Sequence, residues 1–291
     1  MQKRVALITY SGLPEGAASE RLLLPHLAAA RIEAQFVDWR SAGCDFSRFE
    51  LLVLRSCWDS HLHGAQFVEW LQRTSVIVPI VNDVETVLWN RNKFYLRELG
   101  EQGIEIVPTI FVPSGEAIGT EDPARIETWP KVVVKPAVSA SAHNIWLGDR
   151  AEFSTQVELT NRMQSEAFLV QQFIPEIQTQ GEISFIYIDG HYSHAVRKRP
   201  AVGDFRVQEE HGGSCELFVP SSSLPGQVDA IAAAVPQVRR SLYCRIDVVE
   251  KAGKVLLMEL ELIEPELYLN LAEGAAEKLA KAIIKRVAIL N

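Results

Sequence analysis

Apolar residues in the first part of the chain recur in two alternating patterns. Short continuous runs such as Val5–Thr9 are typical of strands buried on both faces. The stripe from Ala17 to Ala30 has helical spacing instead. The alternation continues, with strands expected at 33–39, 51–55 and 76–81 and a helix at 63–74. Elements of these lengths predict a small parallel sheet covered by helices.

From residue 82 the pattern changes to one long helix and then to paired strands. The helix is expected to run to residue 102, before Gly103 and a strand ending at Thr109. Asp189-Gly190, between apolar runs at 182–188 and 192–196, is a strong hairpin signal. Further strands are expected at 132–136, 144–148, 168–173, 244–250 and 255–262, helices at 152–163, 227–241 and 272–287, and a polar surface connection at 115–128. The pattern predicts an α/β unit followed by an antiparallel α+β region.

Composition narrows the class of protein. The 291 residues are 47% hydrophobic and 23% charged, which is ordinary for a globular protein. A formal net charge of −8 argues against nucleic-acid binding through a broadly basic surface. No apolar run approaches the ~18 residues that cross a bilayer, and the first one is too short for a signal peptide. Four cysteines without C-x-x-C spacing are interpreted as reduced thiols, so we expect a cytoplasmic protein. The charge balance and the absence of a membrane-spanning run predict a small-molecule substrate and no membrane partner.

The clearest candidate chemistry is a set of carboxylates on a predicted hairpin. Glu259 and Glu261 are two residues apart in a strand, so both point to the same face, and Asp247 on the partner strand can lie opposite them. Three converging carboxylates repel one another unless a cation lies between them. Mg²⁺ takes oxygen ligands of this kind. The alternative is an acidic strand face that is half exposed to solvent.

Basic residues form a second candidate set. Lys135 ends an apolar strand, where a buried lysine needs an anionic partner. Phosphoryl transfer requires cations around the phosphates, and dispersed lysines could supply them, because the chain has neither a P-loop nor a G-x-G-x-x-G fingerprint. The alternative is that each is a solvated surface charge. The basic residues in question are Lys93, Lys135, Lys198, Arg206 and Arg245.

A third candidate follows a predicted parallel strand of the N-terminal sheet. Ligands of open α/β sheets lie beyond the carboxyl ends of strands. Arg55 could bind a substrate carboxylate there with two hydrogen bonds, and Asp59 is a neighbouring candidate. The alternative is that Asp59 caps a helix and Trp58 packs. We interpret His61 and His63 as surface residues and Cys57 as unsuited to nucleophilic catalysis.

The order of these features resembles that of ATP-grasp enzymes in the branch of glutathione synthetase and D-alanine–D-alanine ligase. Within this branch it is most similar to the O-ureido-D-serine cyclo-ligase-like group, which forms D-cycloserine. The matching segments lie between about residues 82 and 267 and are Asn90–Tyr95, Val132–Pro136, Phe168–Ile174, Gly181–Ser184, Ser193–Lys198, Asp204–Gly213, Arg245–Asp247 and Glu259–Glu261. An Arg…Trp-Asp stretch like Arg55–Asp59 also occurs in that group.

The resemblance implies a division of the chain into domains. Residues 1–84 would form an N-terminal βαβ pre-ATP-grasp domain, and residues 85–291 would form the ATP-grasp domain. The latter would comprise a lid-type subdomain at about 110–168 and a C-terminal catalytic subdomain at about 169–291. Related ligases also imply a homodimer or homotetramer.

The resemblance also implies roles for individual residues. Lys93 and Lys135 would bind the ATP phosphates, and Lys198 would reach the γ-phosphate. Glu182 would bind the ribose, and Arg206 and Arg245 would stabilise the negative charge of the activated substrate. By the same resemblance, adenine would be bound by Gln171, Gln172, Phe173 and Ile174. Two Mg²⁺ ions, for which Mn²⁺ could substitute, would be bound by Asp247, Glu259 and Glu261. Two departures are Glu261, where relatives often have asparagine, and the segment Val138–His143, where relatives have glycine-rich turns.

The implied activity is that of an ATP- and Mg²⁺-dependent ligase. Such an enzyme would phosphorylate a small carboxylate-like or ureido substrate, and a nitrogen nucleophile would then displace the phosphate, with ADP as the other product. The nucleophile could belong to the same molecule or to a second one. Two alternatives stay open at this point: an ATP-grasp kinase or peptide-tagging ligase, and a regulatory module that binds ATP without turnover.

Overall fold

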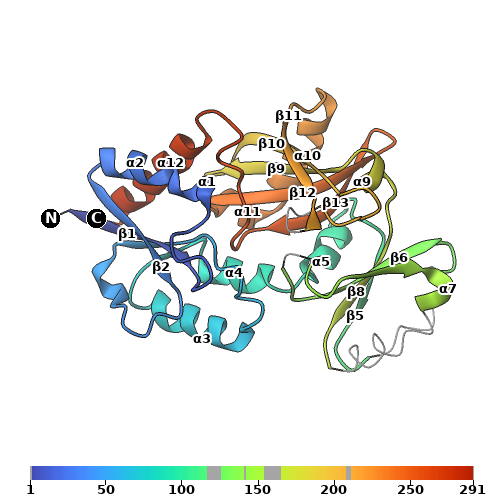
Figure 1. Ribbon diagram of the computed structural model, residues 1–291, viewed down its shortest axis with the longest axis horizontal. Coiled ribbons are helices and arrows are strands. Elements are labelled where there is room, and N and C mark those ends of the chain that lie inside the picture. The colour runs from blue at the N-terminus through green and yellow to red at the C-terminus, as the bar shows by residue number, and fades with distance from the viewer. Residues whose placement is uncertain (1, 117–125, 141, 154–164, 208–210, 291) are drawn as a thin grey trace.

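The computed structural model describes residues 2–116, 126–140, 142–153, 165–207 and 211–290. These residues form three sheets, with the N-terminal sheet at one end of the long axis and the two others at the opposite end (Figure 1). The first sheet is parallel and the other two are antiparallel. The expected combination of an α/β unit and an antiparallel α+β region is therefore confirmed.

The N-terminal sheet is built around one fully buried strand. β1 (Lys3–Thr9) lies between β2 (Ile32–Asp38) and β3 (Leu51–Leu54), and β4 (Ile80–Val81) extends the sheet beyond β3. Val5 through Ile8 are inaccessible to solvent, as the continuous apolar run predicted. The covering helices are α1 (Ala18–Arg21), α2 (Leu23–Ala29) and α3 (Gly64–Ser75), with a short 3₁₀ helix η1 (Phe46–Arg48) before β3. The helix expected at 17–30 is thus divided at Leu22, and β4 is shorter than expected.

The C-terminal helix returns to this first sheet. α12 (Ala275–Ile289) packs beside α2, and its buried residues share one apolar core with Val5 and Leu7 of β1. The two ends of the chain consequently lie next to each other (Figure 1). The N-terminal unit is therefore completed by residues from the far end of the sequence.

The second sheet is small and antiparallel. Its strands follow the order β5 (Thr109–Val112), β8 (Phe168–Gln172), β6 (Lys131–Pro136) and β7 (Trp146–Asp149), and α7 (Arg150–Phe153) follows β7. Val134 and Phe168 are among the residues of its own apolar core. β8 belongs to this sheet, although we expected a subdomain boundary before it. Parts of the expected surface connection at 115–128 and of the helix at 152–163 lie outside the described residues.

The third sheet has five antiparallel strands. They are ordered β11 (Ser214–Phe218), β10 (His191–Arg199), β9 (Glu182–Ile188), β12 (Tyr243–Lys251) and β13 (Lys254–Glu261). The predicted hairpin turn is confirmed, since Asp189 and Gly190 both have positive φ. The sequence pattern missed β11. Helices α10 (Ser223–Ala234) and α11 (Pro236–Arg240) replace the single expected helix at 227–241 because Pro236 begins a new one.

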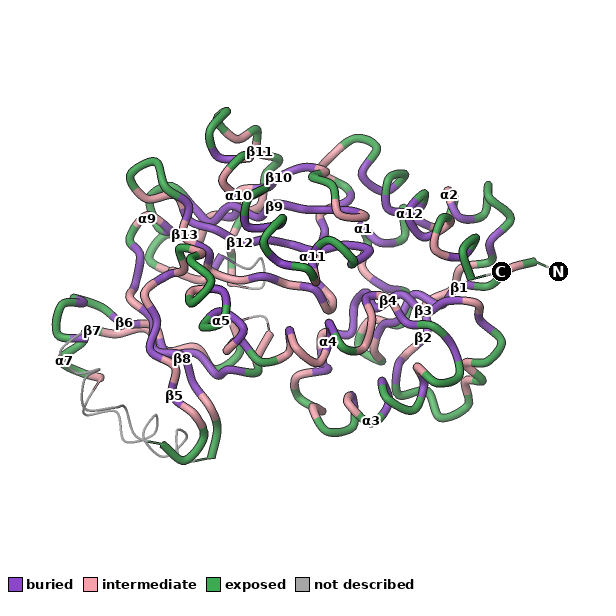
Figure 2. Tube along the Cα trace, turned by 180° about the vertical axis from the view of Figure 1, so that it is seen from behind, coloured by how far each residue is buried: buried purple, intermediate pink, exposed green. Residues whose placement is uncertain are grey.

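Burial on both faces distinguishes the central strands of this sheet. All seven residues of β9 are buried, and the neighbouring β12 is buried over most of its length (Figure 2). Ile183, Phe185 and Tyr187 share the apolar core with α10 and with α5 (Tyr95–Glu101). The opposite face begins with polar Glu182 and Ser184 and continues with Ile186 and Ile188, which pack against the N-terminal unit. Polar and apolar halves therefore divide this face of the sheet.

Asparagine amides bind the connection between the first two sheets to the start of β12 and to the end of β13. Nδ2 of Asn82 donates to the carbonyl oxygens of Tyr243 and Leu262 over 2.9 and 2.7 Å. Nδ2 of Asn90, at the end of α4 (Val84–Asn90), donates to Leu260 O over 2.7 Å. A further short helix, α9 (Glu176–Thr179), connects β8 to β9. None of the helices within the described ranges has both the length and the apolar character needed to span a bilayer.

Candidate active site

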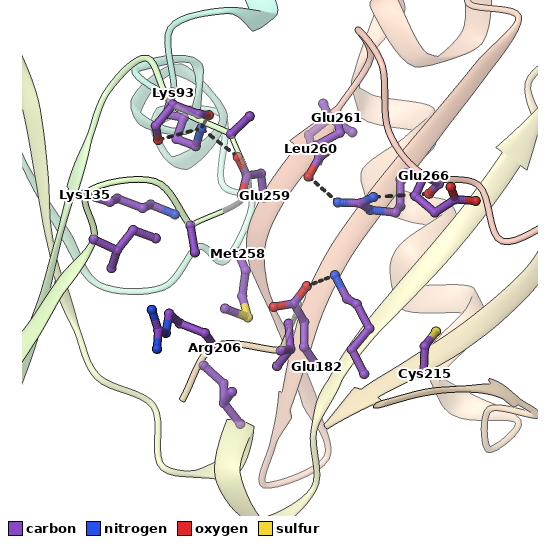
Figure 3. Close-up of a pocket in the computed structure, with 18 of the residues that line it drawn as sticks. Lys93, Lys135, Glu182, Arg206, Cys215, Met258, Glu259, Leu260, Glu261 and Glu266 are labelled. Carbon is purple, nitrogen blue, oxygen red and sulfur yellow. Dashed lines mark hydrogen bonds and ion pairs between the residues drawn. The ribbon is translucent and has the colours of Figure 1, made fainter. Parts of the chain in front are cut away.

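A cavity of about 580 Å³ lies where the three sheets meet. Figure 3 shows that residues far apart in the sequence face one another across it. Its wall includes twelve of the predicted site residues, which are Lys93, Lys135, Gln171, Gln172, Phe173, Ile174, Glu182, Lys198, Arg206, Arg245, Glu259 and Glu261. Asp247, Arg55 and Asp59 do not line it.

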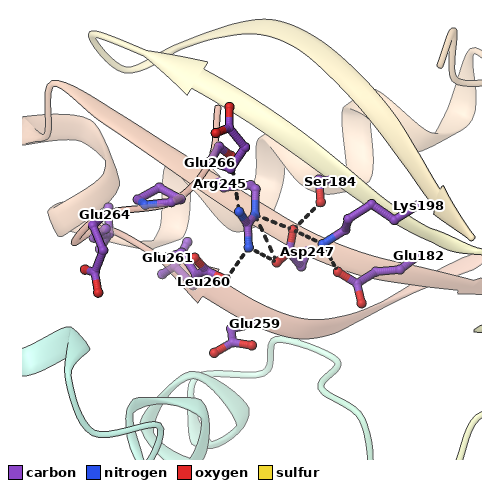
Figure 4. A network of polar contacts seen from close by, with 12 residues as sticks. Glu182, Ser184, Lys198, Arg245, Asp247, Glu259, Leu260, Glu261, Glu264 and Glu266 are labelled. Atoms are coloured by element: carbon purple, nitrogen blue, oxygen red, sulfur yellow. Dashed lines mark hydrogen bonds and ion pairs between the residues drawn. The ribbon is translucent and has the colours of Figure 1, made fainter. Parts of the chain in front are cut away.

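The floor of the cavity is a network of ion pairs on the polar half of the third sheet (Figure 4). Asp247 lies opposite Ser184 on one neighbouring strand and opposite Glu259 on the other, and directly paired residues share a face. Arg245 Nε lies 3.0 Å from Asp247 Oδ1, and Arg245 also pairs with Glu261. Lys198 pairs with Glu182 and lies 3.5 Å from Asp247. Strand alternation had placed Asp247, Glu259 and Glu261 on one face, and the register of β12 and β13 agrees with that placement.

These pairings decide the charge states of the floor. Burial opposes ionisation of Asp247, but Arg245 and Lys198 outweigh it and lower its pKa to about 2. Burial alone would lower the pKa of Lys198, yet Asp247 and Glu182 raise it. Burial raises the pKa of Glu261 to about 7 despite the nearby Arg245 guanidinium. The network therefore stays ionised at Asp247 and Lys198 in neutral solution, whereas Glu261 titrates close to neutrality.

Two lysines approach this floor from the opposite side. Lys93 Nζ is 3.0 Å from Glu259 Oε1 and donates over 2.5 Å to the carbonyl oxygen of Ser139. Lys135, near the end of β6, is buried, and its amino group points across the cavity (Figure 3). No carboxylate of the described residues lies within ion-pair distance of Lys135, and burial lowers its pKa even though Glu259 acts in the other direction. A buried cation without a partner is costly, so this position favours an anionic ligand.

Part of the cavity lining is apolar, and this part is called the apolar slot. Its lining includes Val133, Phe173, Ile177 and Met258, and Gln171 lies at its edge with Nε2 donating over 2.9 Å to Thr109 Oγ1. The slot has the character needed to bind a planar aromatic base. The backbone N–H groups of Gln172 and Phe173 already donate to Pro108 and Lys131 carbonyl oxygens.

Arg206 closes another side of the cavity. Its guanidinium donates to Asp204 within the same loop, with Nη2 to Oδ2 at 2.8 Å, and it faces Lys135 across the space (Figure 3). The pair orients the guanidinium before any ligand binds.

Arg55 and Asp59 have other partners than the expected substrate. Arg55 is 0% exposed, its Nη2 lies 3.1 Å from Glu20 Oε1, and the guanidinium stacks over the Tyr243 ring at 4.6 Å. Asp59 accepts a hydrogen bond from Trp39 Nε1 over 2.8 Å. The proposal that these two residues contact substrate is therefore corrected, because neither reaches the cavity. The neighbouring Trp58 does line it.

Sequence reasoning missed the segment after β13. Glu264, Glu266, Tyr268 and Asn270 all line the cavity, and burial raises the pKa of Glu264 to about 8. Their position in the sequence could have identified them, because they directly follow the strand that carries Glu259 and Glu261. His194 lies away from the cavity, where its Nε2 meets Leu267 O at 3.0 Å.

A divalent cation would have to use carboxylates that already face protein cations. Asp247, Glu259 and Glu261 share one face, and oxygen donors of this kind suit Mg²⁺. In the described parts of the chain, no three histidine, cysteine or acidic residues converge as a metal-binding group. The type of donor fits Mg²⁺, but the three carboxylates are not assembled as a metal-binding group: Glu259 and Glu261 line the cavity, whereas Asp247 is 2% exposed and paired with Arg245.

Comparison with known proteins identifies the family of this chain. Residues 117–263 match the family model described as prokaryotic glutathione synthetase, ATP-grasp domain, which covers half of the chain. The protein therefore belongs to the ATP-grasp family, and it is an ATP-dependent ligase that forms a C–N bond. The kinase, peptide-tagging and regulatory-module alternatives are not favoured.

Similarity to particular members narrows the group. Residues 5–82 match the N-terminal domain of D-cycloserine synthetase DcsG. The cycloserine biosynthesis protein DcsG of Streptomyces lavendulae is 28% identical over 284 residues, which cover 90% of this chain and 93% of that protein. The crystal structure of D-cycloserine synthetase DcsG superposes with a TM-score of 0.88 at 24% identity, covering 98% and 99% of the chains. The structure of D-alanine–D-alanine ligase from Bacillus anthracis, complexed with ATP, superposes with a TM-score of 0.67 at 17% identity. The match covers 99% of this chain and 98% of that chain.

Proposed function

We propose that this ligase uses Mg-ATP to phosphorylate a small carboxylate-like or ureido substrate, after which a nitrogen of the same molecule displaces phosphate. The observation that carries the proposal is Lys135, a buried cation that faces the cavity and has no carboxylate partner among the residues that the structure describes. It lies between an apolar slot and an acidic floor, an arrangement that suits the base, phosphates and metal of a nucleotide. Similarity to DcsG supports ring closure within one molecule. Attack by a second molecule is the alternative.

The nucleotide would lie along the wall formed by β6, β8 and β13. Adenine would occupy the slot at Gln171–Ile174, and Lys93 and Lys135 would hold the phosphates. Glu182 would bind the ribose hydroxyls from its position beside Lys198. Lys198 would approach the γ-phosphate.

The acidic floor would hold the cations and the charge of the reaction. Glu259 and Glu261, supported by Asp247, would ligate two Mg²⁺ ions, for which Mn²⁺ could substitute. Bound Mg²⁺ neutralises phosphate charge. Arg206 and Arg245 would stabilise the negative charge of the phosphorylated substrate, and their carboxylate partners already fix their orientation. Protonation of Glu261 near neutrality would make this site sensitive to pH.

The wider organisation follows from the same proposal. The second and third sheets would be the two ATP-grasp subdomains that close around ATP, with the boundary after β8 instead of at 168. Residues 1–84 would be the pre-ATP-grasp domain, joined by α12. A cytoplasmic location and a homodimer or homotetramer remain parts of the proposal.

A substrate panel tests the reaction. Purified protein with Mg-ATP is offered small carboxylates, ureido compounds, free amino acids and peptides, and ADP and phosphate are measured. Release of both products only with a small compound supports the proposal. Release only with peptides, or with no added acceptor, contradicts it.

A matched pair of lysine variants tests the carrying observation. Lys135→Met should weaken binding of an ATP analogue by about 10- to 100-fold, because a charged donor to phosphate is lost. Lys131→Met changes an exposed lysine on the same strand and should leave binding unaltered. Equal binding by both variants would contradict nucleotide placement beside Lys135.

A further inference from the structure

Lys93 lies between α4 and α5, on the side of the cavity opposite the acidic floor (Figure 3). Its Nζ is 3.0 Å from Glu259 Oε1 and donates over 2.5 Å to Ser139 O. Its backbone N–H donates over 2.8 Å to Ala137 O. One lysine therefore joins a carboxylate of the floor to the loop that connects β6 to β7.

The charge of Glu259 is consequently balanced by the protein itself. The side chain of Lys93 is 9% exposed and that of Glu259 is 26% exposed, so the pair is largely withdrawn from water. Burial opposes ionisation of Glu259, but the ammonium groups of Lys93 and Lys135 outweigh it and lower the pKa of the carboxyl. A metal ion at this carboxylate would therefore meet the Lys93 ammonium at ion-pair distance and be repelled by it.

The ion pair at Arg245 differs from the one at Lys93 in how firmly the cation is held. Arg245 donates to both carboxylate oxygens of Asp247 in addition to its pair with Glu261. Lys93 faces a single carboxylate among the described residues, that of Glu259. Its side chain is a flexible stem with a compact charge, so it can exchange this carboxylate for another anion.

The second lysine on this side of the cavity indicates where such an anion would lie. Lys93 and Lys135 both line the cavity. Burial lowers the pKa of Lys135, and the positive charge of Lys93 acts in the same direction. Two ammonium groups in one cavity favour an anion between them. A phosphate group there would draw Lys93 away from Glu259 and free both carboxylate oxygens for a metal ion.

We propose that Lys93 keeps the metal position at Glu259 closed until a nucleotide phosphate binds its ammonium group, so that bound nucleotide is a condition for tight metal binding. This inference rests on the proposed function, because it places phosphate at Lys93 and metal at Glu259. It also accounts for the arrangement of the acidic residues, which do not converge as a metal-binding group within the described ranges. Part of their charge is already balanced by cations of the protein.

Binding of Mn²⁺, followed by electron paramagnetic resonance, tests the proposal without turnover. Lys93→Met removes the competing cation, so Mn²⁺ should bind this variant about 10-fold more tightly than the wild type when no nucleotide is present. The ATP analogue AMPPNP, measured calorimetrically in EDTA, should bind the variant about 10-fold or more weakly, because a charged donor to phosphate is lost. A merely structural role of Lys93 would not shift the two affinities in opposite directions.

Two further variants locate the effect in the ion pair. Lys93→Arg keeps a positive charge beside Glu259, so its Mn²⁺ affinity should stay within about 3-fold of the wild type. Lys135→Met removes a cation of the same cavity that has no carboxylate at ion-pair distance among the described residues. It should weaken AMPPNP but change the Mn²⁺ affinity by less than about 3-fold. Thermal melts confirm that each variant is folded.

The coupling between the two ligands is measured by repeating the Mn²⁺ titration on protein saturated with AMPPNP. The nucleotide should raise the Mn²⁺ affinity of the wild type, and this gain should be about 10-fold smaller in Lys93→Met. Binding of Mn²⁺ to AMPPNP in solution is the same in both titrations and cancels when the two proteins are compared.

The proposal is overturned if Mn²⁺ binds Lys93→Met no more tightly than the wild type, or if Lys93→Arg or Lys135→Met gains as much affinity. Tight Mn²⁺ binding by the wild type without nucleotide, and no gain when AMPPNP is added, also overturns it. Failure of the proposed function is separate, because ADP release would then be absent with every compound while the Lys93→Met difference in Mn²⁺ affinity remained.

Discussion

Two buried arginine–carboxylate pairs lie on either side of the junction between the N-terminal domain and the five-stranded sheet. Arg55 pairs with Glu20 at 3.1 Å between Nη2 and Oε1, and Arg245 pairs with Asp247 at 3.0 Å between Nε and Oδ1. Arg55 is completely enclosed, whereas Arg245 is 8% exposed and forms part of the cavity wall. Each arginine also donates to a backbone oxygen of the segment after β13.

The difference shows that a buried ion pair does not by itself define a functional site. Removing two charges from water costs free energy in both places. The pair at Arg55 uses its remaining contacts to fix the segment at Pro265, and no part of it reaches the cavity. The pair at Arg245 leaves part of the guanidinium facing the cavity. Access to a cavity therefore separates the two roles.

The largest expected effect is on catalysis, at the residues around Arg245 that face the cavity. Glu259→Gln removes a carboxylate that faces both Lys93 and the proposed metal position, so ADP release should fall by about 10³-fold or more. Thermal melts should show a folded protein. Glu250→Gln is the matched control, because Glu250 lies on the neighbouring strand β12 and outside the cavity. Turnover that survives in Glu259→Gln would remove this residue from the metal site.

Changes at the enclosed Arg55–Glu20 pair should alter the stability of the protein instead of its catalysis. Arg55→Met leaves Glu20 buried without its cation, which should lower the free energy of unfolding by about 3–5 kcal/mol, measured in urea. The double variant Arg55→Met/Glu20→Leu removes both charges and should recover most of that loss. If Arg55→Met is as stable as the wild type but binds substrate poorly, Arg55 acts at the site and the comparison fails.

The contribution of Glu264 to the stability of the folded protein should depend on pH. An unfolded glutamate loses its proton near pH 4.5, but folded Glu264 keeps it until about pH 8, so this residue makes the folded state less stable as pH rises between these values. Glu264→Gln does not titrate, and its stability relative to wild type should grow by about 4 kcal/mol across that window. Urea denaturation at pH 5 and pH 8.5 measures the change. A difference that stays constant with pH would mean that the carboxylate titrates normally.

The smallest effect concerns the tyrosine that joins the two regions. Tyr243 Oη donates to the carbonyl oxygens of Leu54 and Ile263, and its ring lies beneath Arg55. Tyr243→Phe keeps the ring and should cost about 1 kcal/mol of stability. kcat/KM should remain unchanged, and a large loss of activity would indicate that the two regions are coupled through this residue.

Strand alternation carried most of the sequence-based prediction of the site. Glu259 was assigned from its place in a predicted strand, and Glu182, Lys198 and Arg245 were assigned from the ordered set of motifs that resembles a known family. All four line one cavity. Register made this predictable, because residues two apart share a face and paired residues lie opposite each other. The same reasoning could not place Arg55, since it follows a strand in a loop whose side-chain directions have no period.

Elements that depend on distant contacts were not predictable in the same way. β11 is a short strand with mixed exposure, and it forms by pairing with β10 rather than through a pattern of its own. α12 completes the N-terminal unit although more than 180 residues separate it from β4. Glu264 could be read as one more surface carboxylate until Ser60, Trp58 and Arg55 were seen to hold its segment against the cavity.

The sequence by itself determined the type and order of most elements and the polar face of the five-stranded sheet, because these follow from local periodicity and residue type. The class of chemistry followed from the resemblance of its ordered motifs to a known family. Only the tertiary structure decided which buried charges face the cavity and which are enclosed. Arg55 and Arg245 are both buried and both pair with a carboxylate of the protein, and packing alone encloses the first and leaves the second open to the cavity. That choice depends on contacts between residues about 200 positions apart, and no local pattern encodes it.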